Sequence, residues 1–186
     1  MKKIILASAS PRRKELLEQI GLTFSVVPSS AEENIEIQDP KELVSELSKL
    51  KAADVWQNNK DCCVIAADTV VYAQGKILGK PTNRSHGEEM IKMLSGNMHT
   101  VFTGVTVQDE NGAITEVSET EVYFKELTQE DIEKYLERNE YSDKAGAYGI
   151  QGYAARFVEK IHGCYSNVVG LPLSLVDRLL SEKGEN

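Results

Sequence analysis

Apolar residues along this chain recur at two spacings, and the alternation between them predicts a protein that mixes strands and helices. Short apolar runs, such as residues 4–7, have the length and period of buried strands. Longer stretches carry apolar residues every three or four positions and begin with helix signals, as at Asp39-Pro40, where an N-cap residue precedes proline. These patterns predict strands at 4–7, 24–27, 64–72, 99–108, 112–125 and 154–161, and helices at 11–20, 39–56, 85–95, 128–139 and 172–181.

The order of these elements favours an α/β (mixed α+β) fold. Strands and helices interleave along most of the chain, as they do around a parallel sheet. Asn111-Gly112, however, lies between two alternating runs and predicts a tight antiparallel hairpin. We therefore expect a twisted mixed sheet flanked by helices. The 186 residues suit one domain, with or without an added lobe, and they contain no internal repeat or linker.

Composition argues against several classes of protein. A net charge of −8 provides no overall basic field for a nucleic-acid backbone, so we expect no stable nucleic-acid binding. Three cysteines, two of them adjacent at Cys62-Cys63, make no plausible disulfide framework and no zinc spacing. The apolar run after Lys3 is too short for a signal peptide, and no run is long enough to cross a membrane. These features predict a cytoplasmic protein that does not bind membranes.

The first helix is expected to begin with a concentration of positive charge. Arg12, Arg13 and Lys14 lie in its first turn, where the helix dipole favours acidic residues. Such repulsion is tolerable when an anion is bound, and a strand-to-helix turn with free N–H groups can bind a phosphate. The alternative is that the three cations are simply solvated. We favour an anionic ligand that carries phosphate.

Asp68 interrupts the apolar run of residues 64–71. Burying a carboxylate without a partner is costly, so we expect Asp68 at the end of its strand, facing a cleft and held by a cation or a metal ion. It could act as a metal ligand or as a general base. An aspartate that caps a turn is the structural alternative.

Three further positions could complete an anion or metal site. Glu32-Glu33, in the loop of residues 29–38, could supply a carboxylate to Mg²⁺ beside phosphate groups, although adjacent glutamates are often only solvated. Lys51 lies at the edge of the apolar face of its helix, and Lys80 lies in a tight Gly79-Lys80-Pro81 turn. Either lysine could neutralise phosphate charge or remain an ordinary surface residue.

Residues 144–152 are dense in glycine, which allows a backbone to approach a ligand closely. Within them, the amide of Gln151 offers both a donor and an acceptor for reading a nucleobase. The segment matches neither a dinucleotide-binding nor a P-loop pattern, and an ordinary glycine loop is the alternative. The histidines and cysteines show no catalytic spacing and are expected to be structural or surface groups.

Together these residues resemble the Maf family over nearly the whole chain. The resemblance is carried, in order, by Ser8-Ala9-Ser10-Pro11-Arg12-Arg13, Glu32-Glu33, Ala67-Asp68-Thr69, Gly79-Lys80-Pro81 and residues 144–152. It implies a single Maf-like nucleotide pyrophosphatase domain over residues 1–186. Its fold would be similar to that of the inosine triphosphate pyrophosphatases, with an elongated mixed sheet and two lobes around a central cleft. The family is also associated with inhibition of septum formation.

The resemblance implies hydrolysis of a nucleoside triphosphate to the monophosphate and pyrophosphate, with a divalent metal cation, Mg²⁺ or Mn²⁺, as cofactor. The pattern is that of the branch acting on dTTP and UTP, and a second branch prefers N7-methyl-GTP. Asp68 would be the proton acceptor and would share the metal with Glu33. Arg12, Thr69 and Gln151 would set the specificity of this branch. Substrate binding would also involve Ser8, Arg13, Lys51 and Lys80.

Two other functions compete with the enzyme. A regulator of cell division could bind a nucleotide without turnover, but a pure sensor has no need for Asp68 beside a loop suited to metal. A DNA-binding regulator is disfavoured by the net charge and by the lack of a recognition-helix motif. The expected partner is therefore a small nucleoside triphosphate, and the sequence allows a homodimer without requiring one.

Overall fold

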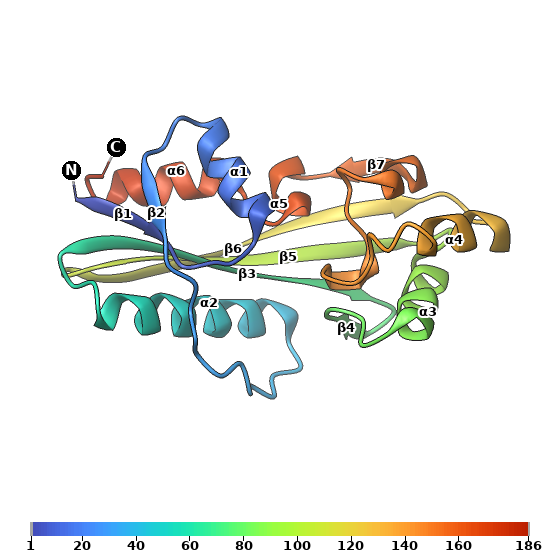
Figure 1. Ribbon diagram of the computed structural model, residues 1–186, viewed down its shortest axis with the longest axis horizontal. Helices are drawn as coiled ribbons and strands as arrows, with labels where there is room; N and C mark the ends of the chain where they lie inside the picture. The colour runs from blue at the N-terminus through green and yellow to red at the C-terminus, as the bar shows by residue number, and fades with distance from the viewer. Residues whose placement is uncertain (1, 186) are drawn as a thin grey trace. The chain divides into compact units, whose positions relative to one another are not determined.

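The computed structural model of the protein describes residues 2–185, in which strands and helices interleave (Figure 1). The strands are β1 (Lys3–Leu6), β2 (Phe24–Val26), β3 (Cys62–Ala73), β4 (Lys76–Leu78), β5 (Met98–Asp109), β6 (Gly112–Phe124) and β7 (Val158–His162). The helices are α1 (Pro11–Gln19), α2 (Pro40–Gln57), α3 (Arg84–Leu94), α4 (Gln129–Leu136), α5 (Tyr165–Val169) and α6 (Leu173–Glu182), with 3₁₀ turns η1 (Ala145–Ala147) and η2 (Tyr153–Phe157).

The strands form one mixed sheet in the order β2-β1-β3-β5-β6-β7, and β4 pairs with β3 beside this path. β1 runs parallel to both β2 and β3, whereas β4 and β7 run antiparallel to their partners. β5 and β6 are neighbours joined by only two residues, Glu110-Asn111, so they form the expected antiparallel hairpin. The predicted mixed α/β fold is confirmed.

The described residues form two compact units. Unit 1 contains residues 2–69, 103–118 and 170–185, and unit 2 contains residues 70–102 and 119–169. Strands β3, β5 and β6 contribute residues to both units.

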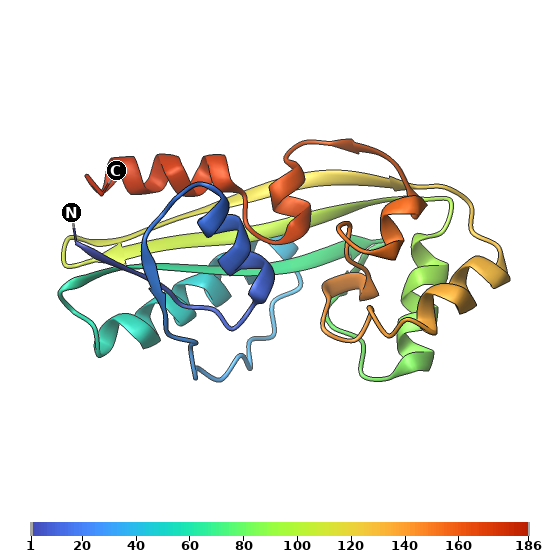
Figure 2. The same cartoon turned by 45° about the horizontal axis from the view of Figure 1, so that its top comes forward.

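In unit 1, α2 covers one face of the sheet, and α1 and α6 cover the other (Figures 1 and 2). α2 begins as predicted, with the Asp39 side chain accepting a hydrogen bond from the Glu42 N–H at 2.9 Å and with Pro40 in the first turn. Its buried face includes Val44, Leu47, Ala52 and Val55, with Ser48 among them. Leu43 and Leu50 of the same helix are only half-buried.

Two contacts fix the position of α2 against the sheet. A Cβ atom at Gly104 of β5 would lie 2.2 Å from the carbonyl oxygen of Val44, so the helix backbone approaches as only glycine permits. One turn later, the Ser48 hydroxyl lies 2.8 Å from that of Thr106, which lies 2.9 Å from that of Thr115. This chain of hydroxyls, buried at Ser48 and Thr106, links α2 to β5 and β6.

Unit 2 has an aromatic core beside α3 and α4. The rings of Phe124, Tyr148 and Phe157 meet edge to face, and Tyr135 of α4 meets Phe157 in the same way. α4 begins with a complete capping box between Thr128 and Asp131, as the sequence indicates.

Several element boundaries differ from the sequence predictions. The strand predicted at 154–161 is a 3₁₀ turn up to Phe157 and a strand only from Val158, because Ala154 and Phe157 are buried at the spacing of a 3₁₀ turn. The helix predicted from Ser85 begins at Arg84, because the Asn83 side chain caps it by accepting from the His86 N–H. The helix predicted to end near Asn139 ends at Leu136, and β4 and α5 were not predicted.

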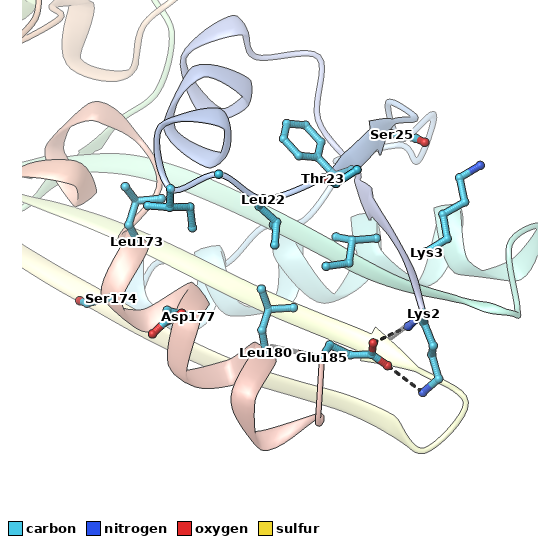
Figure 3. A pocket seen from close by; sticks show the side chains of 14 residues that line it. Lys2, Lys3, Leu22, Thr23, Ser25, Leu173, Ser174, Asp177, Leu180 and Glu185 are labelled. Atoms are coloured by element: carbon cyan, nitrogen blue, oxygen red, sulfur yellow. Dashed lines mark hydrogen bonds and ion pairs between the residues drawn. The ribbon is translucent and has the colours of Figure 1, made fainter.

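A cluster of charged side chains joins both ends of the described chain to the β5–β6 hairpin in unit 1. Asp109, whose side chain is fully buried, accepts from Lys183 at 2.7 Å and from Lys2 at 2.8 Å. Lys2 also contacts Glu110 and Glu185, and Figure 3 shows its two contacts with Glu185. Burial alone would raise the pKa of Asp109, but the hydrogen bonds from Lys183 and Lys2 outweigh it and hold the pKa at about 2.

We expect Asp109→Asn to lower the stability of the protein at pH 7 by about 2 kcal/mol, because the variant loses the charge that both lysines pair with. The folded-state pKa of Asp109 is below its unfolded value, so this stabilisation is present above about pH 4 and is lost as the pH falls towards 2. Urea unfolding of wild type and variant at pH 7, 4 and 2.5 measures the difference.

Glu110→Gln is the matched control, because Glu110 pairs with the same Lys2 but its side chain is 52% exposed. We expect this control to change stability little. A deficit of Asp109→Asn that stays constant between pH 7 and 2.5 would contradict the assignment.

Candidate active site

The residues predicted to form the site fall into two sets. Lys80 and Gln151 belong to unit 2. The other seven belong to unit 1: Ser8, Arg12, Arg13, Glu33, Lys51, Asp68 and Thr69.

The centre of the unit 1 set is an ion pair between Asp68 on β3 and Lys51 on α2. Lys51 Nζ lies 2.5 Å from Asp68 Oδ1, and both side chains are nearly buried, at 13% and 12% exposure. Val64 and Ala66 of β3 pack against Ala52 and Val55 of α2, and alternation along the strand places Asp68 on this same face. The prediction that a cation holds Asp68, and that Lys51 emerges at the edge of the buried face, is confirmed.

The prediction that Asp68 ends its strand is wrong. β3 continues to Ala73, so Asp68 lies well inside it. The strand can carry a charged side chain at this position because the ammonium of Lys51 compensates the charge of Asp68.

Glu33 joins this pair from the loop that follows β2. Its carboxylate lies 3.1 Å from Lys51 Nζ, although the side chain is 51% exposed. Lys51 therefore contacts two carboxylates, from segments far apart in the sequence. This juxtaposition of Glu33 and Asp68 could not be derived from their spacing.

Asp54 anchors the loop that carries Glu33, and the sequence analysis missed it. Its carboxylate accepts from the Ser29 hydroxyl and from the Ser30 N–H, both at 2.8 Å. The Ser29 bond is the main cause that lowers the pKa of Asp54, followed by the bond from Ser30. A signal was available, because Asp54 lies three residues after Lys51 on α2 and faces a loop that opens with two serines.

Arg13 points inwards rather than to solvent. Its guanidinium donates to the Gly170 carbonyl at 2.9 Å, the Ala67 carbonyl at 2.8 Å and the Thr69 hydroxyl at 3.0 Å, with a longer contact to Ser8 at 3.4 Å. Burial lowers the pKa of Arg13 from its ordinary value, although the negative charge of Asp68 acts in the opposite direction. Arg13 is thus surrounded by acceptors of the protein itself.

The rest of the cationic turn matches the sequence in part. Pro11 begins α1 as predicted, but the side chain of Ser10 makes no capping hydrogen bond. The backbone N–H of Ser10 donates to Ser8 Oγ at 3.2 Å. Lys14 is exposed and lies 3.5 Å from Glu18 one helical turn later. Arg12 is half-buried, on the same turn.

In unit 2, the turn that carries Lys80 is tied to the glycine-rich segment. The Gly146 N–H donates to the Gly79 carbonyl at 3.1 Å, while Lys80 itself is exposed. Gln151 is exposed as well, on the same segment.

The glycines of this segment meet the protein's own side chains, which differs from the expected approach to a ligand. A Cβ atom at Gly146 would lie 2.8 Å from Val71, and one at Gly149 would lie 2.6 Å from the Lys144 stem. A Cβ atom at Gly152 would lie 2.1 Å from Glu140 Oε2, which accepts from the Tyr153 N–H at 2.8 Å. The glycines let the segment pack closely against these side chains, while Gln151 stays exposed.

The histidines and cysteines play the structural roles expected of them. His99 is buried, and its Nε2 lies 2.7 Å from the Tyr148 hydroxyl; burial lowers the pKa of His99 to about 4. His86 contacts Thr82 at the surface. Burial also raises the pKa of the Cys63 thiol to about 12, as for a packed and unreactive cysteine.

The described residues hold no group of three metal-binding side chains, and the apolar hollow of unit 1 is separate from the predicted site residues. Among residues 2–185, no three His, Cys, Asp or Glu side chains are grouped so that they could hold a metal ion. The hollow in Figure 3 is lined by residues that include Leu22, Leu173 and Leu180, and none of the predicted site residues lines it.

No helix within the described part of the chain has the length and apolar character to cross a membrane.

The mixed α/β fold places the protein in a known class of structures. Two solved structures share it: a HAM1 protein from Coxiella burnetii, with a TM-score of 0.53 and 15% identity, and the Ham1 protein of Staphylococcus aureus, with a TM-score of 0.51 and 13% identity. Each similarity covers 98% of this chain and 100% of the other. These similarities show the mixed α/β fold alone, because a shared fold at this identity does not establish a shared activity.

The protein belongs to the Maf family, because the model of the Maf-like proteins matches residues 3–183. A dTTP/UTP pyrophosphatase of Bacillus cereus (strain ATCC 10987 / NRS 248) is 48% identical over 183 residues, which are 98% of this chain and 90% of the relative. A dTTP/UTP pyrophosphatase of Bacillus anthracis is 47% identical, over 98% of this chain and 96% of the relative. The resemblance found in the sequence is confirmed.

We expect Gly152→Ala to lower the stability of the protein by about 1–3 kcal/mol, because its methyl group would collide with the Glu140 carboxylate. Urea unfolding measures the loss. Gly79→Ala is the control, because nothing lies within 4 Å of its Cβ position, and it should change stability by no more than about 0.5 kcal/mol. Equal effects of the two substitutions would show that the segment around Gln151 is not held by this contact.

Proposed function

We propose that this protein hydrolyses dTTP and UTP to the nucleoside monophosphate and pyrophosphate. The substrate class is supported by relatives named dTTP/UTP pyrophosphatases, which are 47–48% identical over almost the whole chain. The observation that carries the chemistry is Asp68, a nearly buried carboxylate inside the central strand, paired with Lys51. A hydrolase needs a carboxylate held at a fixed place, and the pair with Lys51 supports that role for Asp68.

In this proposal, Asp68 orients the attacking water and accepts its proton. Water then attacks the α-phosphorus, the bond between that phosphorus and the bridging oxygen breaks, and pyrophosphate leaves. Lys51 orients Asp68 before the substrate arrives, because its ammonium donates to the carboxylate.

The remaining cations would neutralise the phosphates. Arg12 lies in the first turn of α1, where backbone N–H groups and the helix dipole also favour an anion. Ser8 lies just before this turn, and its hydroxyl is available as a donor to phosphate oxygen. Lys80, exposed on the turn after β4, would contribute a further positive charge.

The donor set around Lys51 also fits a divalent cation. Glu33 and Asp68 both contact Lys51 Nζ, so two carboxylates already share one positive charge. Carboxylate oxygens together with substrate phosphates are the ligands that Mg²⁺ and Mn²⁺ prefer. Glu33 and Asp68 would hold such an ion, which would neutralise charge on the leaving pyrophosphate when bound.

Base recognition would fall to Thr69 and Gln151. Each offers a polar group that can pair with a pyrimidine edge, and a base that leaves such a group unpaired is rejected strongly. Thr69 directly follows Asp68 on β3, so recognition and catalysis would use neighbouring residues of one strand.

We propose that residues 1–186 act as a single domain, because one family model spans residues 3–183. Nucleoside triphosphates are small cytoplasmic molecules, so we expect the protein in the cytoplasm. The proposal requires neither nucleic acid nor a membrane, and it is compatible with a monomer or a homodimer.

Pyrophosphate release from a panel of nucleoside triphosphates tests the proposal. With Mg²⁺ or Mn²⁺ present, we expect dTTP and UTP to be hydrolysed with the highest kcat/KM, and CTP, ITP, N7-methyl-GTP and the other nucleotides at least tenfold less well. If no nucleotide in the panel releases pyrophosphate while dTTP still binds in calorimetry, the result would instead support a nucleotide sensor.

Asp68→Asn is the matched control for the panel. The variant keeps the size of the side chain and should fold, yet loss of the proton acceptor should lower kcat by about 10²–10⁴-fold. If the variant still turns over dTTP, Asp68 is not the proton acceptor. If a chelator does not affect turnover of the wild-type protein, the reaction does not use a metal ion.

A further inference from the structure

β1 ends before β3 does, which leaves part of β3 without that neighbour. The two strands pair in parallel up to Leu6 and Ile65, and the Ala7 N–H makes the next bond, to the Ile65 carbonyl at 2.8 Å. The chain then turns into α1, while β3 continues to Ala73. The next carbonyl of β3 that faces this side, that of Ala67, therefore needs a donor from elsewhere.

The guanidinium of Arg13 supplies that donor. Nη1 donates to the Ala67 carbonyl at 2.8 Å, and Nη2 donates to the Thr69 hydroxyl at 3.0 Å. These two acceptors flank Asp68 on both sides. Nε donates to the Gly170 carbonyl at 2.9 Å, which joins the start of α1, the middle of β3 and the segment before α6 within unit 1.

These contacts occupy most of the hydrogen-bonding capacity of Arg13. A guanidinium has five N–H donors in a rigid fork, and the four contacts to Gly170, Ala67, Thr69 and Ser8 engage all three of its nitrogens. A phosphate ligand would need the same donors. The donor geometry thus favours the protein's own backbone over a bidentate grip on phosphate.

Arg13 also sets the hydrogen-bonding polarity of Thr69. Because Nη2 donates to Thr69 Oγ1, that oxygen acts as an acceptor there, and the threonine's own proton is directed elsewhere. Thr103 Oγ1 at 2.9 Å and the Gly170 carbonyl at 3.4 Å are its neighbours on the protein. Without Arg13, the hydroxyl could rotate and present either polarity to a base.

We propose that Arg13 is a positioning residue, which holds Asp68 and the Thr69 hydroxyl in place and does not bind the triphosphate. This departs from the expectation that both arginines of the turn contact substrate. It rests on the proposed function, since Asp68 and Thr69 matter for the reaction only if they act as described above.

The test compares Arg13→Lys with Arg12→Lys, two substitutions that keep the charge at adjacent positions. We expect Arg13→Lys to lower kcat and to reduce the preference for dTTP over CTP by about tenfold or more, because Lys cannot span both acceptors. Its affinity for inorganic tripolyphosphate, measured by calorimetry, should stay within about twofold of wild type. Arg12→Lys, in contrast, should weaken the binding of tripolyphosphate.

The substitution Thr69→Val tests whether Arg13 acts on base preference through the Thr69 hydroxyl or only through the stability of the fold. If Arg13 acts through Thr69, adding Arg13→Lys to Thr69→Val should reduce the base preference no further. Independent reductions, or a tenfold weaker affinity of Arg13→Lys for tripolyphosphate with the base preference intact, would overturn the proposal.

A stability cycle needs no turnover and therefore stands apart from the proposed function. In urea unfolding, Arg13→Lys and Thr69→Val should be coupled by about fivefold in the unfolding equilibrium constant, since each removes the same hydrogen bond. Additive effects would overturn the proposal even if the enzyme assay behaves as expected. Coupled effects without any dTTP hydrolysis would instead refute the function and leave the structural role of Arg13 in place.

Discussion

The arrangement of unit 1 depends on keeping a charged carboxylate inside its central strand. Asp68 can lie there only because Lys51 reaches it, since an unpaired buried charge would be neutralised or would destabilise the strand. The position of Lys51 depends in turn on how closely α2 packs. Gly104 admits the helix backbone, and the hydroxyls of Ser48 and Thr106 fix its register against β5. The features that define the fold of unit 1 are thus the ones that set the geometry of its candidate site.

β3 is held around Asp68 on one face and along the edge that β1 leaves open. On the face towards α2, Lys51 neutralises Asp68 and draws in Glu33 from a loop that Asp54 anchors. From the side of α1, Arg13 bonds to the residues before and after Asp68. A strand held from both sides around one carboxylate is preorganised, which is what a reaction driven by positioning and electrostatics requires. The early end of β1 is what leaves room for Arg13.

Much of the fold could be predicted from local patterns. Helix starts with strong caps, such as Asp39-Pro40 and Thr128 with Asp131, appear where the sequence places them, and the hairpin at residues 110–111 follows from its turn residues. The errors lie where tertiary contacts decide. Residues 153–157 are apolar enough for a strand but pack as a 3₁₀ turn, and β4 is too short to be recognised from its pattern.

The candidate site residues could be proposed from the sequence, but their relative geometry could not. A lone aspartate in an apolar run indicates a buried charge, yet nothing local shows that its partner is Lys51 or that Glu33 joins them. The cluster of Arg12, Arg13 and Lys14 is visible as excess charge, but only the end of β1 explains why Arg13 turns inwards. The glycines at residues 146–152 indicate close approach, and only the packed structure identifies Lys144 and Glu140 as what they approach.

Hydrolysis of dTTP in ¹⁸O-labelled water tests the central claim most directly, because it reports which phosphorus the water attacks. If the carboxylate held by Lys51 directs water to the α-phosphorus, the label will appear in dTMP and the released pyrophosphate will carry none. Label in pyrophosphate, or release of orthophosphate instead, would contradict the account.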